Sequence, residues 1–384
     1  MNRLYEQMTT SVFERMSALA AEHGAVNLGQ GFPDFGWPPE ILEAAAKAVV
    51  EGSNQYAPSR GTAALREAVA QHYNRHFDQR LDASSVCVTS GATEALGSAI
   101  LASVEPGDEV IILTPAYDSY APMIRRAGAR PVEVALQPPA WRIERDAIER
   151  AIGPSTRAII FNNPHNPAGR LFGMDELETI AALAREHDLL VISDEVWEHI
   201  VLDGRRFTPL ATLEGMAERT IKIGSAGKIF SLTGWKVGWM VAAPALAQVL
   251  ARAHQFLTFS TAPNLQAAVA FGLDEGDSWL QPMRDRFQRS RDLMASGLSL
   301  AGFVTLDVAA TYFMCVDLAA SGINLDDESF AAAAVAQAGV AVVPLSAFAE
   351  HDPPHHLVRL CFSKKDETIE AGLAAMAKAK GLRP

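Results

Sequence analysis

Positive charge is scarce in this 384-residue chain, which has 33 lysine and arginine residues against 45 aspartate and glutamate residues. The formal net charge is −12 at neutral pH. Proteins that bind nucleic acid or anionic membrane surfaces present a basic patch to them. The composition therefore argues against both classes of protein.

Cysteine is also rare. The three cysteines, Cys87, Cys315 and Cys361, each lie inside an apolar, strand-like run. Such positions predict reduced core residues and not a disulfide framework or a zinc site. We therefore expect no metal centre.

Long apolar runs are missing too. The first 16 residues lack the apolar core of a signal peptide. The longest segment without a charged residue, 253–273, contains His254, Pro263 and Asn264 and is too polar to span a membrane. We expect a cytoplasmic enzyme.

Short apolar segments alternate with amphipathic segments through the first two thirds of the chain. Continuous apolar strands between helices predict a mainly parallel sheet that is covered on both faces, as in an α/β fold. The expected strands are 85–89, 109–113, 130–134, 158–161, 189–193, 220–224 and 239–243, and the expected helices are 38–50, 62–76, 93–104, 118–127, 144–151 and 175–187.

The pattern changes near residue 277. A long charged helix is expected at 278–300, followed by strands at 311–318, 340–344 and 357–362 and helices at 326–338 and 366–380. This part predicts a smaller α+β domain, and the chain is long enough for two domains. We therefore assign 1–45 to an N-terminal arm that forms part of the small domain, 46–276 to the large domain and 277–384 to the C-terminal small domain.

Polar clusters follow four of the expected strands. They occupy residues 89–94, 162–167, 193–195 and 224–228. In an open parallel sheet, ligands bind beyond the carboxyl ends of the strands. Four such clusters at one edge predict a binding site there.

Two lysines, Lys228 and Lys236, lie in a stretch that is otherwise made largely of glycine, serine, threonine and apolar residues. Burial favours the neutral amine of a lysine. A neutral amine is a nucleophile that forms a Schiff base with a carbonyl compound. The alternative interpretation of Lys228 is a surface lysine on a glycine-rich turn.

The other clusters offer complementary groups. Residues 91–93 open a helix, where free backbone N–H groups favour an anion such as phosphate. No ATP-binding or dinucleotide-binding glycine motif is present. Asp194 ends an apolar strand, and a carboxylate there needs a cationic partner, unless it is a helix N-cap.

Two further residues complete the set. Asn166 lies between two prolines and is held rigidly, unless it is only a turn residue. Arg359 lies in an apolar strand, where its planar fork suits a carboxylate; the alternative is an edge-strand arginine that points to solvent. Pyridoxal phosphate would use these groups together: its aldehyde with Lys228, its phosphate with 91–93, its ring nitrogen with Asp194 and its phenolic oxygen with Asn166.

The motifs resemble those of the fold-type I, class I pyridoxal-phosphate aminotransferases, and within them the methionine, glutamine and kynurenine aminotransferase group. The resemblance extends over nearly the whole chain. It rests on the segments NLGQGFPDF (27–35), NQY (54–56), TSGATEAL (89–96), PHNP (164–167), SDEV (193–196), SAGK (225–228), TGWKVGW (233–239) and RLCF (359–362).

The resemblance implies a role for each residue of the cofactor site. Lys228 would form the covalent bond to the cofactor and later move a proton, Asp194 would pair with the ring nitrogen, and Asn166 would bind the phenolic oxygen. Tyr117 would stack on the ring. The phosphate would be held by Gly91, Ala92, Thr93, Ser225 and Lys236 and by Tyr56 of the neighbouring subunit, which implies a homodimer.

The resemblance also implies a substrate site. Arg359 would bind the substrate α-carboxylate, with the Gly31 backbone and Asn166 nearby. The side chain of the substrate would lie among Phe13, Trp37 and, from the other subunit, Phe259 and Ser260.

One residue departs from the family pattern. The family has a tyrosine where this chain has Trp197, and that tyrosine would bind the phenolic oxygen of the cofactor. An indole N–H donates a hydrogen bond but cannot ionise as a phenol does. Either Trp197 donates from a longer reach, or the contact is lost and the pH optimum changes.

We therefore expect transfer of the amino group of a neutral, sulfur-containing, amide or aromatic L-amino acid to a 2-oxo acid, with ping-pong kinetics. The one identifiable carboxylate-binding arginine argues against a dedicated aspartate enzyme. The nearest alternative is a cysteine-conjugate β-lyase (C–S lyase) using the same cofactor. A non-enzymatic regulator lacks the room before Asn27 and the positive charge for a DNA-binding domain, and a structural or scaffolding protein would leave Lys228 without a purpose.

Overall fold

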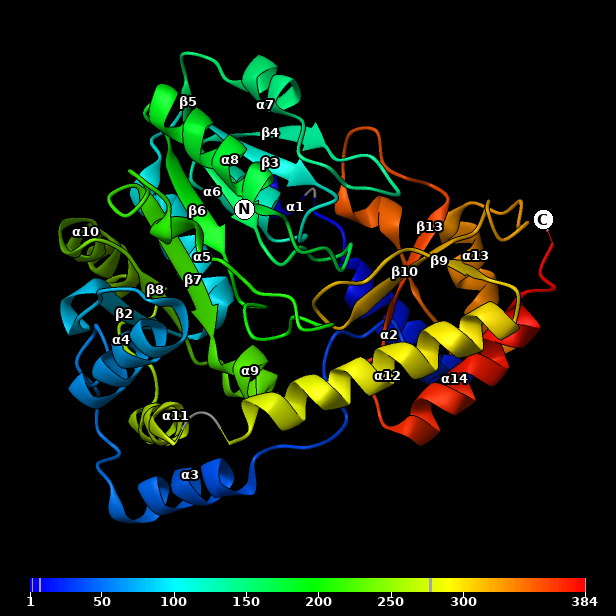
Figure 1. Ribbon diagram of the computed structural model, residues 1–384, viewed down its shortest axis with the longest axis horizontal. Helices are drawn as coiled ribbons and strands as arrows, with labels where there is room; N and C mark the ends of the chain where they lie inside the picture. Colours follow the sequence, from blue (N-terminus) through cyan, green and yellow to red (C-terminus); the bar gives the residue numbers. More distant parts are fainter. Residues whose placement is uncertain (2, 7, 276–277, 384) are drawn as a thin grey trace.

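The chain forms a large seven-stranded sheet covered by helices and a smaller antiparallel sheet beside it (Figure 1). The structure is a computed structural model and describes residues 1, 3–6, 8–275 and 278–383. No helix among these residues is long and apolar enough to cross a membrane. The three cysteines are buried and unpaired, as predicted.

Six strands of the large sheet run in parallel, and β8 is antiparallel to both of its neighbours. This confirms the predicted α/β fold class. Across the sheet the order is β2 (Val86–Thr89), β8 (Gly238–Val241), β7 (Thr220–Ser225), β6 (Leu190–Asp194), β5 (Thr156–Asn162), β3 (Glu109–Thr114) and β4 (Arg130–Ala135).

Helices cover both faces of this sheet (Figure 1). Alternate residues of a strand point to opposite faces. Cys87 belongs to the core that includes α5 (Gly91–Ser103), whereas Val86 and Val88 belong to the core that includes α4 (Ala63–Phe77). The helices of this part are α3 (Pro39–Glu51), α4 (Ala63–Phe77), α5 (Gly91–Ser103), α6 (Tyr120–Arg126), α7 (Arg145–Ala151), α8 (Met174–Glu186), α9 (Ala226–Ile229), α10 (Pro244–Gln255) and α11 (Pro263–Asp274).

The small sheet is antiparallel, in the order β12 (Val343–Pro344), β13 (Leu357–Cys361), β10 (Phe313–Asp317) and β9 (Val304–Thr305). Helix α12 (Leu280–Leu300) begins close to α9, where Trp279 contacts Phe230, and packs against α14 (Asp366–Ala379) (Figure 1). The remaining helices are α1 (Arg3–Glu6), α2 (Val12–His23), α12 (Leu280–Leu300), α13 (Asp327–Ala333) and α14 (Asp366–Ala379).

The N-terminal arm associates with the C-terminal part of the chain. Strand β1 (Val26–Asn27) pairs in parallel with β11 (Val340–Ala341), and α2 packs against β11. These contacts involve α2 and β1, whereas α3, which begins at Pro39, packs against α11 of the large part. The assignment of 1–45 to the small domain stays a prediction. The boundary after residue 45 stays a prediction, and the boundary at 276/277 lies outside the described residues.

Some short elements, such as β1 and β9, were not expected, and two larger features also differ from the sequence-based expectation. The single strand expected at 340–344 is two short strands, because β11 pairs with β1 whereas β12 pairs with β13. Helices α10 and α11 were not predicted. The uncharged segment 253–273 contributes to both, and α11 packs against α3 and α4, so its polar face is too small to produce a clear helical period.

Candidate active site

The carboxyl ends of β2, β5, β6 and β7 meet at a cavity of about 220 Å³. This is the edge of the sheet where the four polar clusters were expected to converge. The residues predicted from the sequence that line the cavity are Gly91, Ala92, Thr93, Tyr117, Asn166, Asp194, Trp197, Ser225, Lys228 and Lys236.

Lys228 lies on α9, the short helix that follows β7. Its Nζ donates a hydrogen bond to the Tyr312 hydroxyl over 3.0 Å and lies 4.5 Å from the centre of the Trp197 ring. Burial lowers the pKa of Lys228 to about 8. Lys228 therefore faces the cavity and not a solvent-exposed turn, and a large share of it is a neutral amine near pH 8.

Asp194 ends β6 and is buried. The Tyr120 hydroxyl donates to one carboxylate oxygen over 2.6 Å, and the Val196 N–H donates to the other over 3.4 Å. Burial raises the pKa of Asp194, and these hydrogen bonds reduce that shift. Turns follow Asp194, so it does not cap a helix; its carboxylate is placed to stabilise a cation inside the cavity.

The first turn of α5 forms the other end of the cavity. Its opening residue, Gly91, has a φ of +79°, and an added Cβ there would lie 3.3 Å from Cε of Lys236. Backbone N–H groups at a helix start have no partner within the helix, so they attract an anion. Together with Ser225 and Lys236, this turn offers a phosphate-binding cradle.

These groups fit pyridoxal phosphate. The cavity presents an amine for an aldehyde, a buried carboxylate for a ring nitrogen and a cradle for a phosphate, and the Tyr117 ring forms part of its wall. The chain's own residues thus offer a group for the aldehyde, one for the ring nitrogen and several for the phosphate of the cofactor.

Arg359 lies on β13 and is only 1% exposed. Its guanidinium donates to the Asn166 side-chain oxygen over 2.9 Å and to the Gly29 carbonyl over 3.2 Å. Its Nε has no hydrogen-bond partner. Asp118 acts on the guanidinium electrostatically, but among the described residues no carboxylate forms a close ion pair with it. Since β13 lies between β12 and β10, Arg359 is not on an edge strand.

Aromatic rings surround this guanidinium. Its central carbon lies 3.8 Å from the ring centre of Phe313 and 5.0 Å from those of Phe13 and Phe348. Burial lowers the pKa of Arg359 to about 10, which still leaves it charged at neutral pH. A buried cation of this kind is a receptor for an anion such as a carboxylate.

Of the other predicted substrate residues, two lie close to Arg359 and the rest lie elsewhere. Phe13 packs against Arg359, and the Gly31 carbonyl accepts a hydrogen bond from Tyr312. Trp37 lines a separate groove and donates to the Ser231 carbonyl over 3.0 Å. Tyr56, Phe259 and Ser260 do not line the cofactor cavity; Tyr56 is 85% exposed, and its ring meets that of Phe259 at 5.5 Å.

Three polar residues of the site were given no role of their own from the sequence: Tyr120, Tyr312 and Asn162, the first residue of the predicted cluster 162–167. Asn162 donates to the Asp194 carbonyl over 2.8 Å and accepts from the Asn166 N–H over 2.8 Å. Tyr120 and Tyr312 fall in segments that were interpreted only as a helix and a strand. The position of Asn162 at the end of β5 was a usable signal, but the two tyrosines are recognisable only through their partners in space.

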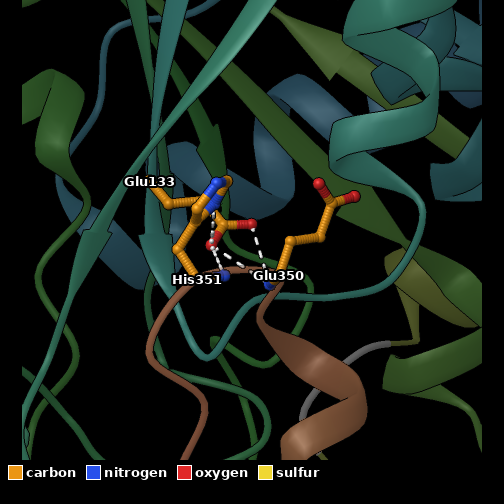
Figure 2. A group of neighbouring side chains, drawn as sticks. All are labelled: Glu133, Glu350 and His351. Atoms are coloured by element: carbon orange, nitrogen blue, oxygen red, sulfur yellow. Dashed lines mark hydrogen bonds and ion pairs between the residues drawn. The ribbon is translucent and has the colours of Figure 1, made fainter.

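Among the described residues, two groups of side chains outside the cavity have the spacing of metal ligands. In one, shown in Figure 2, the Glu133 carboxylate accepts hydrogen bonds from the backbone N–H groups of Glu350 and His351. The Glu350 carboxylate binds Arg125. These carboxylates already have donors. The second group, Glu149, Glu186 and His187, is exposed, and both of its carboxylates form ion pairs with Arg145. Neither group carries a metal assignment.

The fold and the cavity define a pyridoxal-phosphate enzyme of the aminotransferase type. Residues 23–376 match the family described as Aminotransferase class I and II. The chain therefore belongs to this family, whose members depend on pyridoxal phosphate, and it is an aminotransferase.

The chain is also similar to named aminotransferases over nearly its whole length. The chain is 44% identical to the probable N-succinyldiaminopimelate aminotransferase DapC of Mycobacterium tuberculosis over 96% of both chains, and a solved structure of the N-succinyldiaminopimelate aminotransferase of that organism has a TM-score of 0.95 over 99% of both chains. It is 40% identical to methionine aminotransferase of Escherichia coli over 95% of both chains. It is 35% identical to kynurenine–oxoglutarate transaminase 3 of Rattus norvegicus, over 95% of this chain and 87% of that protein.

Proposed function

We propose that this aminotransferase moves the amino group of a neutral, sulfur-containing, amide or aromatic L-amino acid, of the methionine, glutamine, kynurenine or phenylalanine type, to a 2-oxo acid. The main support is the buried guanidinium of Arg359, which is surrounded by aromatic rings and forms no ion pair with a carboxylate among the described residues. This geometry favours a substrate with one α-carboxylate and an apolar or aromatic remainder.

The chemistry follows from the groups around the cavity. When bound, pyridoxal phosphate supplies the aldehyde that takes up the amino group and the electron-withdrawing ring that makes the Cα proton removable. Lys228, whose pKa is about 8, accepts the Cα proton as a neutral amine and returns it at the cofactor side. Asp194 stabilises positive charge on the ring. Donor and acceptor use one site in turn, so ping-pong kinetics are expected.

The electrostatics beside Arg359 favour a neutral substrate side chain. Asp118, which acts electrostatically on Arg359, lines a cavity of about 590 Å³ together with Glu328, Glu350 and two arginines. Arg125 binds Glu350, and Arg15 lies 4.0 Å from Glu328. A second carboxylate on the substrate would therefore meet cations that are already paired and an additional acidic group.

The named relatives give the substrate panel. Methionine and kynurenine are taken from two of them, and N-succinyldiaminopimelate, from the 44% identical relative, is a second candidate. With several 2-oxo acids as acceptors, methionine, glutamine, kynurenine and phenylalanine should give higher kcat/KM than aspartate or the N-succinyl compound. A preference for the N-succinyl compound would contradict the neutral-substrate proposal.

A β-lyase reaction on cysteine conjugates would use the same Lys228 and the same cofactor. The two activities separate by product, because β-elimination forms pyruvate and ammonia without an added 2-oxo acid. We expect little pyruvate under those conditions. Pyruvate formation faster than amino transfer would favour the lyase.

We further propose a homodimer in which Tyr56 completes the phosphate site of the neighbouring subunit. The support is the high exposure of Tyr56 and its contact with exposed Phe259. Lys228→Ala and Tyr56→Ala homodimers should both be impaired, and mixing the two should restore activity, since one site of each hybrid is intact. No recovery in hybrids would overturn this arrangement. The cytoplasmic location remains a prediction.

The role of Lys228 is tested directly. The purified protein should be yellow and lose that colour with borohydride, which attaches the cofactor to Lys228. Lys228→Ala should lose the absorbance of the covalently bound cofactor while Lys47→Ala, a change of an exposed lysine on α3, keeps it. An unchanged spectrum in Lys228→Ala would contradict the assignment.

A further inference from the structure

The hydroxyl of Tyr312 lies between the Lys228 amine and the backbone of the N-terminal arm. Tyr312 is buried, immediately before β10. Lys228 Nζ lies 3.0 Å from the hydroxyl oxygen, and the Gly31 carbonyl oxygen lies 2.8 Å from it. One phenol thus connects segments at residues 31, 228 and 312.

The direction of both hydrogen bonds follows from the number of protons. A phenol has a single proton to donate, and the carbonyl of Gly31 can only accept. The Tyr312 proton therefore lies on the bond to Gly31, and the oxygen lone pair faces Lys228 and accepts its N–H. Both an ammonium and a neutral amine have an N–H for this bond, so it persists in either state of Lys228.

Aromatic contacts keep the phenol in this position. The Trp197 ring is perpendicular to that of Tyr312 at 4.5 Å, and the Phe313 ring lies 4.9 Å away. The Trp197 ring centre is also 4.5 Å from Lys228 Nζ. Since an indole N–H only donates, Trp197 cannot accept a hydrogen bond from the amine through its nitrogen; the acceptor here is Tyr312.

We propose that Tyr312 is a positioning residue for Lys228, whose amine it holds in one orientation through a hydrogen bond fixed at its far side by Gly31. The role rests on the amine function of Lys228 proposed above. Gly31 belongs to the N-terminal arm and lies beside Arg359, because a Cβ added to Gly31 would be 3.9 Å from the guanidinium. The two hydrogen bonds of Tyr312 therefore connect the Lys228 amine to the part of the arm that lies beside Arg359.

Removing the hydroxyl should make Lys228 more acidic and less well placed. The oxygen accepts from the ammonium and so stabilises the charged form, and loss of such a bond corresponds to a fall of about one pKa unit. Cys361, Asp194, Arg359 and Lys236 also act on Lys228 electrostatically, and they are unchanged in Tyr312→Phe. In the holoenzyme, kcat should fall about tenfold for each donor with little change in KM, as expected for a displaced proton acceptor.

The test measures Lys228 in the cofactor-free full-length protein. Trace acetylation between about pH 6 and 11, with mass spectrometry of the Lys228 peptide, gives the titration of this one amine. The Lys228 profile should move to lower pH in Tyr312→Phe, while the profile of Lys47 in the same sample stays in place. Tyr73→Phe removes a buried hydroxyl from outside the site and should leave Lys228 unchanged.

A Lys228 profile in Tyr312→Phe that superimposes on that of the unaltered protein would overturn the role of Tyr312. If that variant does not fold, 4-fluorophenylalanine at position 312 fills most of the lost volume without a comparable acceptor, and the same shift is expected. Failure of the proposed role of Lys228 itself would be seen in a different experiment, because the cofactor spectrum of Lys228→Ala would then be unchanged.

Discussion

The guanidinium of Arg359 donates a hydrogen bond to the side-chain oxygen of Asn166 over 2.9 Å. Arg359 belongs to the small sheet, and Asn166 follows β5 of the large sheet. The proposed carboxylate receptor thus touches the wall of the cofactor cavity directly. A substrate held by Arg359 would place its Cα within the same cavity as Lys228.

Arg359→Ala should weaken every amino donor alike. Truncating one partner of a buried, hydrogen-bonded charge pair costs about 2–5 kcal/mol, so kcat/KM should fall by at least about thirtyfold, mainly through KM. Arg359→Lys keeps a charge but loses the planar fork and should recover part of the loss. Steady-state kinetics with methionine, glutamine and phenylalanine measure this, with exposed Arg157→Ala as the control.

An effect of Arg359→Ala on one donor and not on the others would contradict this role. It would mean that Arg359 contacts a substrate side chain and not the α-carboxylate.

Gly238→Ala should weaken cofactor binding. A Cβ at Gly238 would lie 2.7 Å from the backbone carbon of Gly91 and 2.8 Å from the backbone nitrogen of Ala92. Backbone cannot yield as a flexible side chain can, so the first turn of α5 must shift. Overpacking costs about 1–3 kcal/mol, which corresponds to a rise of about five- to 150-fold in the Kd for pyridoxal phosphate.

The matched control is Gly234→Ala, four residues away, where an added Cβ meets nothing within 4 Å. Titration of the cofactor-free proteins with pyridoxal phosphate should separate the two variants. Equal affinities would show that the phosphate-binding turn does not depend on this close approach.

Much of the large sheet could be predicted from the sequence because most of its strands have a continuous apolar centre and most of its helices are amphipathic. The cavity followed from one rule, that the carboxyl ends of parallel strands share an edge. That rule placed Asn166, Asp194 and Lys228 together without knowledge of any contact between them.

The remaining parts depend on contacts that leave no local pattern. Tyr312 meets Gly31 across 281 residues of sequence, and neither segment indicates the other. Tyr120 occupies the first position of α6, where a tyrosine is unremarkable until its hydroxyl meets Asp194. Helix α11 is packed by helices on more than one side, so its sequence lacks the polar stripe that would reveal it.

His254 should make stability depend on pH. Its Nδ1 lies 2.5 Å from a Glu94 carboxylate oxygen, and its Nε2 lies 2.7 Å from the Ser59 carbonyl. Both partners only accept, so both nitrogens carry protons and the ring is an imidazolium. Burial by itself lowers the pKa of His254, but these hydrogen bonds and the Glu94 charge raise it above its usual value.

A folded-state pKa above the unfolded value stabilises the protein fully below about pH 6.5, and the contribution is lost as the pH rises through the folded pKa. The difference in melting temperature between the unaltered protein and His254→Gln should therefore shrink from about pH 6 to 9. His23→Gln, a change of an exposed histidine at the end of α2, is the control. A difference that stays constant over this range would mean that the ring is neutral.

Lys222→Met should be strongly destabilising. The Lys222 ammonium binds the carboxylates of Glu195 and Glu198, and all three side chains are at most 1% exposed. Without the lysine, two carboxylates remain buried with no cation between them, and breaking such a buried pair costs about 3–5 kcal/mol. Urea unfolding should show this loss, whereas exposed Lys47→Met should change the free energy of unfolding by less than about 0.5 kcal/mol.

A second substitution tests the cause of that loss. In Lys222→Met, the further change Glu198→Gln removes one of the two unpaired buried charges and keeps an acceptor for the Tyr73 hydroxyl, which donates to Glu198 over 2.9 Å. The double variant should be more stable than Lys222→Met alone, because the destabilisation comes from the buried carboxylates and not from the lost lysine stem. If the two substitutions destabilise additively, packing of the lysine stem and not charge accounts for the effect.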